Sequence, residues 1–155
     1  MAEIESCTLT GTGAFTVLAY ESQSVTYTGD YNLHVQRVNN PGNATAIDFG
    51  QTLSGAIAIP VEMDAYTFSA SAGDKVLVIM SKTSGSLWPG IRIYGPDGTK
   101  LCETSSSATA KIASCTLPVT GAYTILVYDS FNGTYTGDYR LFFNHLTLYL
   151  PLLLK

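Results

Sequence analysis

The sequence is poor in charged residues, histidine and cysteine. Of its 155 residues, 13% are charged, two are histidine and three are cysteine. The formal net charge is −4 and no run of basic residues occurs, so the chain lacks the positive surface with which proteins bind phosphate backbones. We therefore expect no nucleic-acid partner. Apolar residues make up 46% of the sequence, which is enough to build a buried core in a chain of this length.

Long apolar runs are absent as well. The longest one, Leu146–Leu154, is interrupted by Pro151 and is about half of the roughly 20 residues that a transmembrane helix requires. We therefore predict no transmembrane segment. Residues 1–15 contain no basic stretch followed by an apolar one, so the sequence predicts no signal peptide in this chain.

An internal repeat is the most informative feature of the sequence. AEIESCTL at residues 2–9 returns as AKIASCTL at residues 110–117, an offset of 108 residues (for example, 115 − 7 for Cys7 and Cys115). The same offset relates the segments TGAFTVLAYES and TGAYTILVYDS, and the segments TYTGDYNL and TYTGDYRL. A shared β-rich composition alone would not keep this register, so we interpret the match as a duplication.

The duplication divides the chain unequally. Residues 1–38 correspond only to the second half of a repeat, and we call them the half-repeat. Residues 39–45, with the sequence NNPGNAT, have the composition of a linker. Residues 46–146 form one complete copy, and residues 147–155 are an apolar tail.

Alternating apolar and polar residues predict β-strands throughout the chain, and helical periodicity is absent. The predicted strands are 14–20, 31–38, 65–70, 75–81, 91–94, 111–117, 122–128 and 138–143. Turn sequences separate them, such as Gly95-Pro96-Asp97-Gly98, in which Gly98 can take a positive φ at little cost. This spacing of short strands is typical of an antiparallel β-sandwich or barrel.

Five motifs in the complete copy occur in the order found in one bacterial family. They are Asp64–Phe68, Ala72–Val76, Ile91–Gly98, Thr120–Ile125 and Gly137–Leu141. On these motifs the complete copy resembles the bacterial pre-peptidase C-terminal (PPC) domain. The resemblance implies an all-β, antiparallel, jelly-roll-like sandwich, with the half-repeat as an extra set of strands. It also implies a non-catalytic accessory module of secreted enzymes or cell-surface proteins.

The cysteines predict one disulfide and one unpaired thiol. If the segments around Cys102 and Cys115 are neighbouring antiparallel strands, the two side chains can face each other. A disulfide there would stabilise the fold by about 3 kcal/mol in an oxidising compartment; the alternative is two buried free thiols. Cys7 matches Cys115 in the repeat but has no second copy of Cys102. We expect Cys7 to be free or to form an intermolecular bond.

The sequence offers no convincing catalytic residue, and we predict that the module is not an enzyme. His34 matches Phe142 and His145 matches Arg37 across the repeat, an exchange not expected of a catalytic base. The spacing of cysteine and histidine fits no zinc site.

We predict no cofactor. Calcium is the alternative, because it prefers several oxygen ligands from a compact loop. The closest acidic pair, Glu62 and Asp64, and the turn residues Asp74 and Asp97 are the candidates. Turn formation is the favoured explanation for the latter two.

Trp88, the single tryptophan, lies in a loop rich in glycine and proline. It can stack on a sugar or a partner surface, or it can cap the core. A glycan- or matrix-binding module of a secreted hydrolase is therefore the alternative function.

Self-association is the function that the sequence favours. The half-repeat has apolar strand faces, including Phe15 and Val17, that need a partner. In the tail, Tyr149, Leu150 and Leu152 can add as a strand to another subunit or pack back on their own domain. The expected assembly is a homo-oligomer or a fibre, formed by strand addition or swapping.

Overall fold

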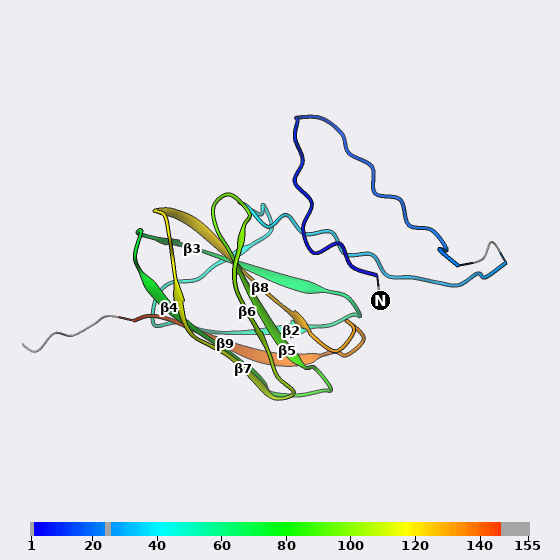
Figure 1. The fold of residues 1–155 in the computed structure, drawn as a ribbon. Coiled ribbons are helices and arrows are strands. Elements are labelled where there is room, and N and C mark those ends of the chain that lie inside the picture. Colours follow the sequence, from blue (N-terminus) through cyan, green and yellow to red (C-terminus); the bar gives the residue numbers. More distant parts are fainter. Residues whose placement is uncertain (1, 24–25, 147–155) are drawn as a thin grey trace, which may run out of the picture.

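The computed structural model describes residues 2–23 and 26–146, and all of its regular secondary structure there is β. The strands are β1 (Thr45–Ala46), β2 (Thr52–Ile57), β3 (Met63–Ala70), β4 (Lys75–Lys82), β5 (Pro89–Tyr94), β6 (Lys100–Ser105), β7 (Thr109–Thr116), β8 (Gly121–Asp129) and β9 (Gly137–His145). They form two stacked sheets, which confirms the predicted β-sandwich (Figure 1). The first sheet has the order β1-β3-β8-β5-β6 and the second has the order β2-β9-β4-β7. All neighbours are antiparallel except β1 and β3, which are parallel.

The second half of the complete copy pairs with the first half and not within itself, whereas the first half also contains the ladders β1–β3 and β5–β6. In the second half, β8 lies between β3 and β5, β9 lies between β2 and β4, and β7 lies beside β4. No ladder joins β7, β8 and β9 to one another. Every backbone ladder of the second half is therefore made with a strand of the first half.

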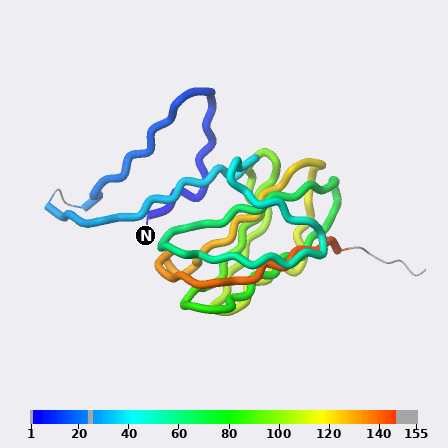
Figure 2. Tube along the Cα trace, turned by 180° about the vertical axis from the view of Figure 1, so that it is seen from behind, coloured from blue at the N-terminus to red at the C-terminus, as the bar shows by residue number. Residues whose placement is uncertain are grey.

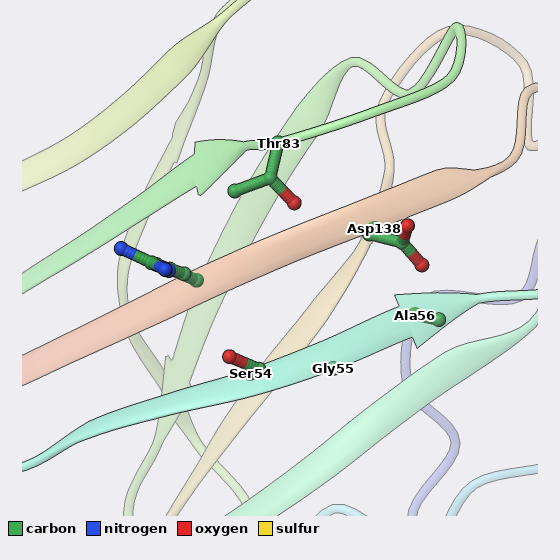
Figure 3. A pocket seen from close by; sticks show the side chains of 6 residues that line it. Ser54, Gly55, Ala56, Thr83 and Asp138 are labelled. Carbon is green, nitrogen blue, oxygen red and sulfur yellow. The ribbon is translucent and has the colours of Figure 1, made fainter.

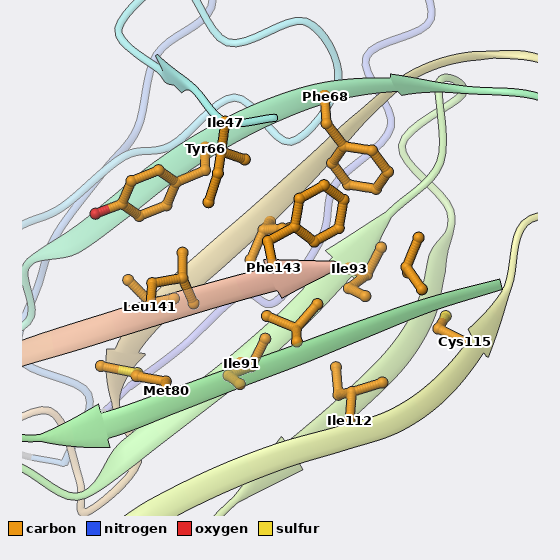
Figure 4. Close-up of a cluster of buried hydrophobic side chains, with 14 of the residues drawn as sticks. Ile47, Tyr66, Phe68, Met80, Ile91, Ile93, Ile112, Cys115, Leu141 and Phe143 are labelled. Carbon is orange, nitrogen blue, oxygen red and sulfur yellow. The ribbon is translucent and has the colours of Figure 1, made fainter. Parts of the chain in front are cut away.

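Alternating side chains from both sheets fill the space between the sheets (Figure 4). From the second sheet, Val78 and Met80 on β4 and Leu141 and Phe143 on β9 have no exposed surface. They meet Ile93 and its neighbours from the first sheet. Each such side chain contributes about 1.5–3 kcal/mol by leaving water, so this layer is the main source of stability.

The outer face of the first sheet is also partly apolar. Ala65, Tyr94 and Leu126 form a second buried cluster there, and Val38 and Ala44 pack against it. The chain before β1 therefore crosses this face and covers its centre, which is why β8 is buried on both sides.

The predicted strands of the complete copy correspond to β3, β4, β5, β7, β8 and β9. Three strands, β1, β2 and β6, were not among the predicted ones, although the disulfide prediction considered a strand around Cys102. The β2 sequence TLSGAI contains serine and glycine, whose local preference is for turns. Pairing with β9 overrides that preference. The turn before β6 agrees with the sequence, since Gly98 has φ +84° and donates a hydrogen bond to the carbonyl of Gly95 at 2.9 Å.

The half-repeat differs from expectation. Residues 2–23 and 26–38 contain no strand, although the sequence predicts strands at 14–20 and 31–38. Figures 1 and 2 show this segment as a long loop that leaves the sandwich and returns to it. The physical reason is the cross-pairing of the halves: the half-repeat carries counterparts of β7, β8 and β9 without the strands that would pair with them.

The close contact between β2 and β9 generates a prediction. Gly55 is paired with Tyr139, and a Cβ on Gly55 would overlap the Tyr139 ring. We expect Gly55→Ala to lower the free energy of unfolding by about 1–3 kcal/mol, because the buried ring must shift. Urea denaturation measures the change. Gly42→Ala, where a Cβ meets no atom within 4 Å, is the control, and we expect it to be neutral or stabilising by at most about 1 kcal/mol. Equal effects of the two substitutions would contradict the prediction.

Candidate interaction sites

The predicted disulfide between Cys102 and Cys115 is present, with a Cα–Cα distance of 6.2 Å. Its setting differs from the prediction. Cys102 lies on β6, the edge of the first sheet, and Cys115 lies on β7, the edge of the second. The disulfide therefore ties the two sheets together along one side of the sandwich, where no backbone ladder can do so. Cys7 is free and exposed.

The half-repeat exposes a series of large apolar side chains. Phe15 and Val17, which the sequence predicts to contact a partner, are 54% and 57% exposed. Others in the segment are also exposed: Ile4, Leu9, Leu18, Tyr20, Tyr27, Tyr31, Leu33 and Val35. Soluble proteins rarely expose apolar side chains in such a continuous series unless a partner covers them.

An ionic cluster lies on the outer face of the first sheet, and we call Arg92, Lys100, Glu103 and Tyr128 the Arg92 cluster. The Arg92 guanidinium lies 4.4 Å from the centroid of the Tyr128 ring. Its Nε donates to Glu103 Oε1 at 2.7 Å, and Tyr128 donates to the same oxygen at 2.9 Å. Lys100 donates to Glu103 Oε2 at 2.6 Å. The arrangement neutralises an arginine that is only 8% exposed.

The half-repeat attaches to this cluster through two glutamates. Glu3 accepts a hydrogen bond from Arg92 at 2.6 Å, and Glu5 accepts one from Lys100. The Glu3 and Glu5 side chains remain 30% and 42% exposed, so solvent screens both ion pairs and each contributes about 1 kcal/mol or less. The contact is therefore a weak tether for the start of the half-repeat.

Opposing effects set the pKa values in the Arg92 cluster. Burial by itself would raise the pKa of Glu103, but hydrogen bonds from Lys100, Arg92 and Tyr128 outweigh it and lower the pKa to about 2. For Tyr128, burial raises the pKa and the nearby Arg92 charge opposes that rise. Glu103 is therefore ionised at neutral pH.

The aromatic cluster consists of Trp88, Phe131 and Tyr135, at one end of the sandwich. The Trp88 and Phe131 rings are 4.9 Å apart, and Phe131 stacks on Tyr135 at 4.9 Å. The buried Asp129 side chain joins the two segments that carry the cluster. It accepts hydrogen bonds from the backbone N–H of Trp88 at 2.9 Å and from the backbone N–H of Tyr135 at 3.0 Å. Trp88 remains 38% exposed, so it packs on the domain and still presents a face to solvent.

A polar network is buried where β3 and β9 approach each other. Tyr139 donates to Asp64 Oδ2 at 2.5 Å, and its hydroxyl lies 2.7 Å from that of Tyr66. Because the Tyr139 proton is directed at Asp64, Tyr66 must donate to Tyr139. Burial raises the pKa of Asp64 and the Tyr139 hydrogen bond partly opposes it. The hydrogen bonds of this network offset the free-energy cost of burying its polar groups.

The acidic candidates for calcium each have a partner within the chain. Asp74 accepts the Ser71 N–H at 2.8 Å, and Asp97 accepts the N–H and hydroxyl of Thr99. Glu62 accepts the Ala58 N–H at 2.5 Å. Within residues 2–23 and 26–146, no group of three or more His, Cys, Asp or Glu side chains is placed to hold a metal.

A shallow depression lies on the outer face of the second sheet (Figure 3). It is lined by Ser54, Gly55, Ala56, Thr83, Asp138 and Arg140. It exists because the small residues of β2 lie beside the longer side chains of β9. Asp138 already accepts a hydrogen bond from Ser84 at 2.6 Å.

The remaining candidate residues are dispersed. His145 lies 3.2 Å from Asp74 at one end of β9, whereas His34 belongs to the half-repeat. The part of the chain that the structure describes contains no helix long and apolar enough to cross a membrane. Tyr149, Leu150 and Leu152 lie outside the described residues.

These features define a two-sheet β-sandwich with candidate interaction surfaces on its outside. A family model of the bacterial pre-peptidase C-terminal domain matches residues 62–129, which lie within the sandwich. This confirms the resemblance drawn from the motifs. PPC domains are non-catalytic accessory domains and are found in secreted proteins.

Solved structures show the same fold. The pre-peptidase C-terminal domain of the collagenase from Bacillus anthracis is 16% identical and has a TM-score of 0.56, covering 73% of this chain and 100% of that one. Periplasmic inhibitors of g-type lysozyme from Aeromonas hydrophila and Salmonella Typhimurium have TM-scores of 0.51 and 0.50. They are 16% and 23% identical and cover 67% and 68% of this chain and 96% and 100% of their own. No curated protein sequence matches the chain.

Sequence reasoning missed the Arg92 cluster and the aromatic partners of Trp88. Arg92 stands between Ile91 and Ile93 in an otherwise apolar strand, a position that predicts a buried charge with a partner. The partners of Trp88 carried no such signal, because Phe131 and Tyr135 are more than forty positions away (131 − 88 = 43).

The low pKa of Glu103 generates a prediction about acid stability. A carboxylate whose pKa is 4.5 when unfolded and about 2 when folded stabilises the fold above pH 4.5 and loses that effect as the pH falls toward 2. We expect Glu103→Gln to lower the free energy of unfolding by about 1 kcal/mol at pH 7, a value limited by solvent screening. The difference from the unsubstituted protein should disappear near pH 2.

Urea denaturation over this pH range measures the effect. Residues 39–155 without the half-repeat are the control, since they lack Glu3 and Glu5 and keep the rest of the cluster. A stability difference that does not change with pH in either protein would refute this role of Glu103.

Proposed function

We propose that this protein is a non-catalytic extracellular structural and interaction module that self-associates through its half-repeat, with the apolar tail as a second contact. The observation that carries the proposal is the exposed apolar series of residues 2–38. Apolar surface gains about 25 cal/mol for each Å² removed from water, so covering this series with protein is strongly favourable.

The extracellular assignment is supported by the family and by the disulfide. PPC domains are found in secreted proteins, and disulfides persist in oxidising compartments. The non-catalytic assignment is supported by the accessory role of the family. The dispersed histidines of the chain agree with it.

The oligomeric state tests the proposal. We expect the full chain to associate at micromolar concentration and residues 39–155 to remain monomeric, as measured by light scattering after size-exclusion chromatography. Removing residues 147–155 instead measures the contribution of the tail, which contains Tyr149, Leu150 and Leu152. A strictly monomeric full chain, with a half-repeat that resists proteolysis, would refute self-association.

The second candidate function is binding of a glycan or matrix polymer by the aromatic cluster. The observation that favours it is the partly exposed Trp88 ring, which packs on Phe131 and whose backbone N–H is bound by Asp129, since a fixed aromatic face suits a sugar or an apolar peptide. Trp88→Ala should then weaken binding to soluble glycans or collagen fibres by about tenfold or more. Val119→Ala, at another exposed apolar position, should leave binding unchanged. No binding by the unsubstituted chain would eliminate this candidate.

A further inference from the structure

The duplication relates each exposed apolar residue of the half-repeat to a residue whose environment the structure defines. Leu9, Phe15, Val17, Tyr31 and Leu33 are between 54% and 72% exposed. At an offset of 108 they correspond to Leu117, Tyr123, Ile125, Tyr139 and Leu141, all of which have 0% exposed surface. The half-repeat therefore carries the inward-facing residues of a sandwich without the remainder of that sandwich.

The topology specifies what the missing remainder must be. The counterparts of β7, β8 and β9 cannot pair with one another, because in the complete copy each of them pairs only with β2, β3, β4 or β5. Two half-repeats meeting across a twofold axis would therefore lack every native ladder. The half-repeat fits a polypeptide that supplies strands of the β1–β6 type.

Other copies of the chain cannot supply these strands without giving up ladders that they already form. Residues 2–146 contain two second halves, residues 2–38 and 110–146, and one first half, residues 39–109. In that first half, β2, β3, β4 and β5 already form ladders with residues 110–146. Exchange between copies would release one second half for each one that it accommodates, so it gains no net contacts.

Cys7 indicates that the partner carries a cysteine with which it can form a disulfide. It corresponds to Cys115, whose partner Cys102 lies on β6, and Cys7 is exposed and free. A partner that pairs with the half-repeat in the native manner places its β6 beside Cys7. The partner therefore needs a cysteine at the position of Cys102.

The present contacts of the half-repeat leave its inward face available. Glu3 and Glu5 bind the Arg92 cluster, and they correspond to Lys111 and Ala113, which are exposed on β7. The tether thus uses only outward-facing positions of the segment. Docking of a first half does not require these two side chains.

We propose that residues 2–38 bind a first-half polypeptide of the same domain family, with strands equivalent to β1–β6. The two together form a second sandwich, closed by a disulfide between Cys7 and the cysteine of that first half. Two thiols and one small-molecule disulfide such as oxidised glutathione give the new disulfide and two small-molecule thiols. This inference shares with the proposed function the half-repeat as the interaction segment, but it names a different partner.

The test uses residues 39–109 of this chain as the probe, because they contain β1–β6 and Cys102. The probe is mixed with the full chain in a glutathione redox buffer. We expect a complex of one chain and one probe by native mass spectrometry, with Cys7 joined to the Cys102 of the probe by peptide mapping.

Matched variants separate native pairing from adhesion. Leu33→Asp should weaken the complex by about tenfold or more, because its counterpart Leu141 is buried. Asn32→Asp adds the same charge at a position whose counterpart, Arg140, faces outward, and should leave binding unchanged. Cys7→Ser should keep the complex and lose the covalent bond. Equal binding by residues 39–155, or a probe joined to Cys115, would show exchange and overturn the inference.

A fused protein covers the case in which the free probe aggregates. Residues 39–109 are joined directly to Ala2 of the full chain, because Ala2 corresponds to Ala110. We expect two disulfides, no reactive thiol, and protection of residues 2–38 from protease. A reactive Cys7 and an exposed half-repeat in this protein would overturn the inference.

The outcomes distinguish this inference from the proposed self-association. A chain that associates by itself but ignores the probe, with an exposed half-repeat in the fused protein, retains the proposed function and overturns the inference. A chain that is monomeric alone but binds the probe through Cys7 retains the inference and refutes self-association.

Discussion

The cross-pairing of the two halves of the domain is the constraint on which the rest of the structure depends. The strands β7, β8 and β9 are consecutive in the chain, yet each has its ladders with strands of the first half. A second half on its own can therefore neither form its backbone ladders nor bury its apolar strand faces. The half-repeat shows this directly, because it has the same kinds of residue and forms no strand in residues 2–23 and 26–38.

Specific side-chain links follow the same pattern and join one half to the other. Cys115 is bonded to Cys102, Tyr139 to Asp64, and Asp129 to the backbone of Trp88. The apolar core gives most of the stability. These links are directional, so they add specific contacts between the two halves to the packing of the core. The half-repeat keeps the cysteine and the tyrosine in Cys7 and Tyr31, which indicates that it retains the means to make such links.

Much of the complete copy could be predicted, because alternation of apolar and polar residues is a local signal. Strands β3, β4, β8 and β9 have inward residues at every second position, and the structure places them where the pattern does. β2 was missed because Gly55 reads as a turn residue, whereas its real role is to leave room for the Tyr139 ring. The disulfide pair was predicted, but its strands lie in different sheets. The Arg92 cluster was not foreseen, since its members come from β5, β6 and β8.

By itself, the sequence determined that the chain holds one complete β repeat and an unmatched second half, with one cysteine left over. Internal repeats, the periodicity of strands and an odd number of cysteines can all be recognised from the order of the residues, without knowledge of which strands pair. The tertiary structure alone decided that the two halves interlock, and therefore what the unmatched half lacks. Ladder partners are distant in the chain, and their choice depends on the packing of the whole sandwich and not on any local pattern.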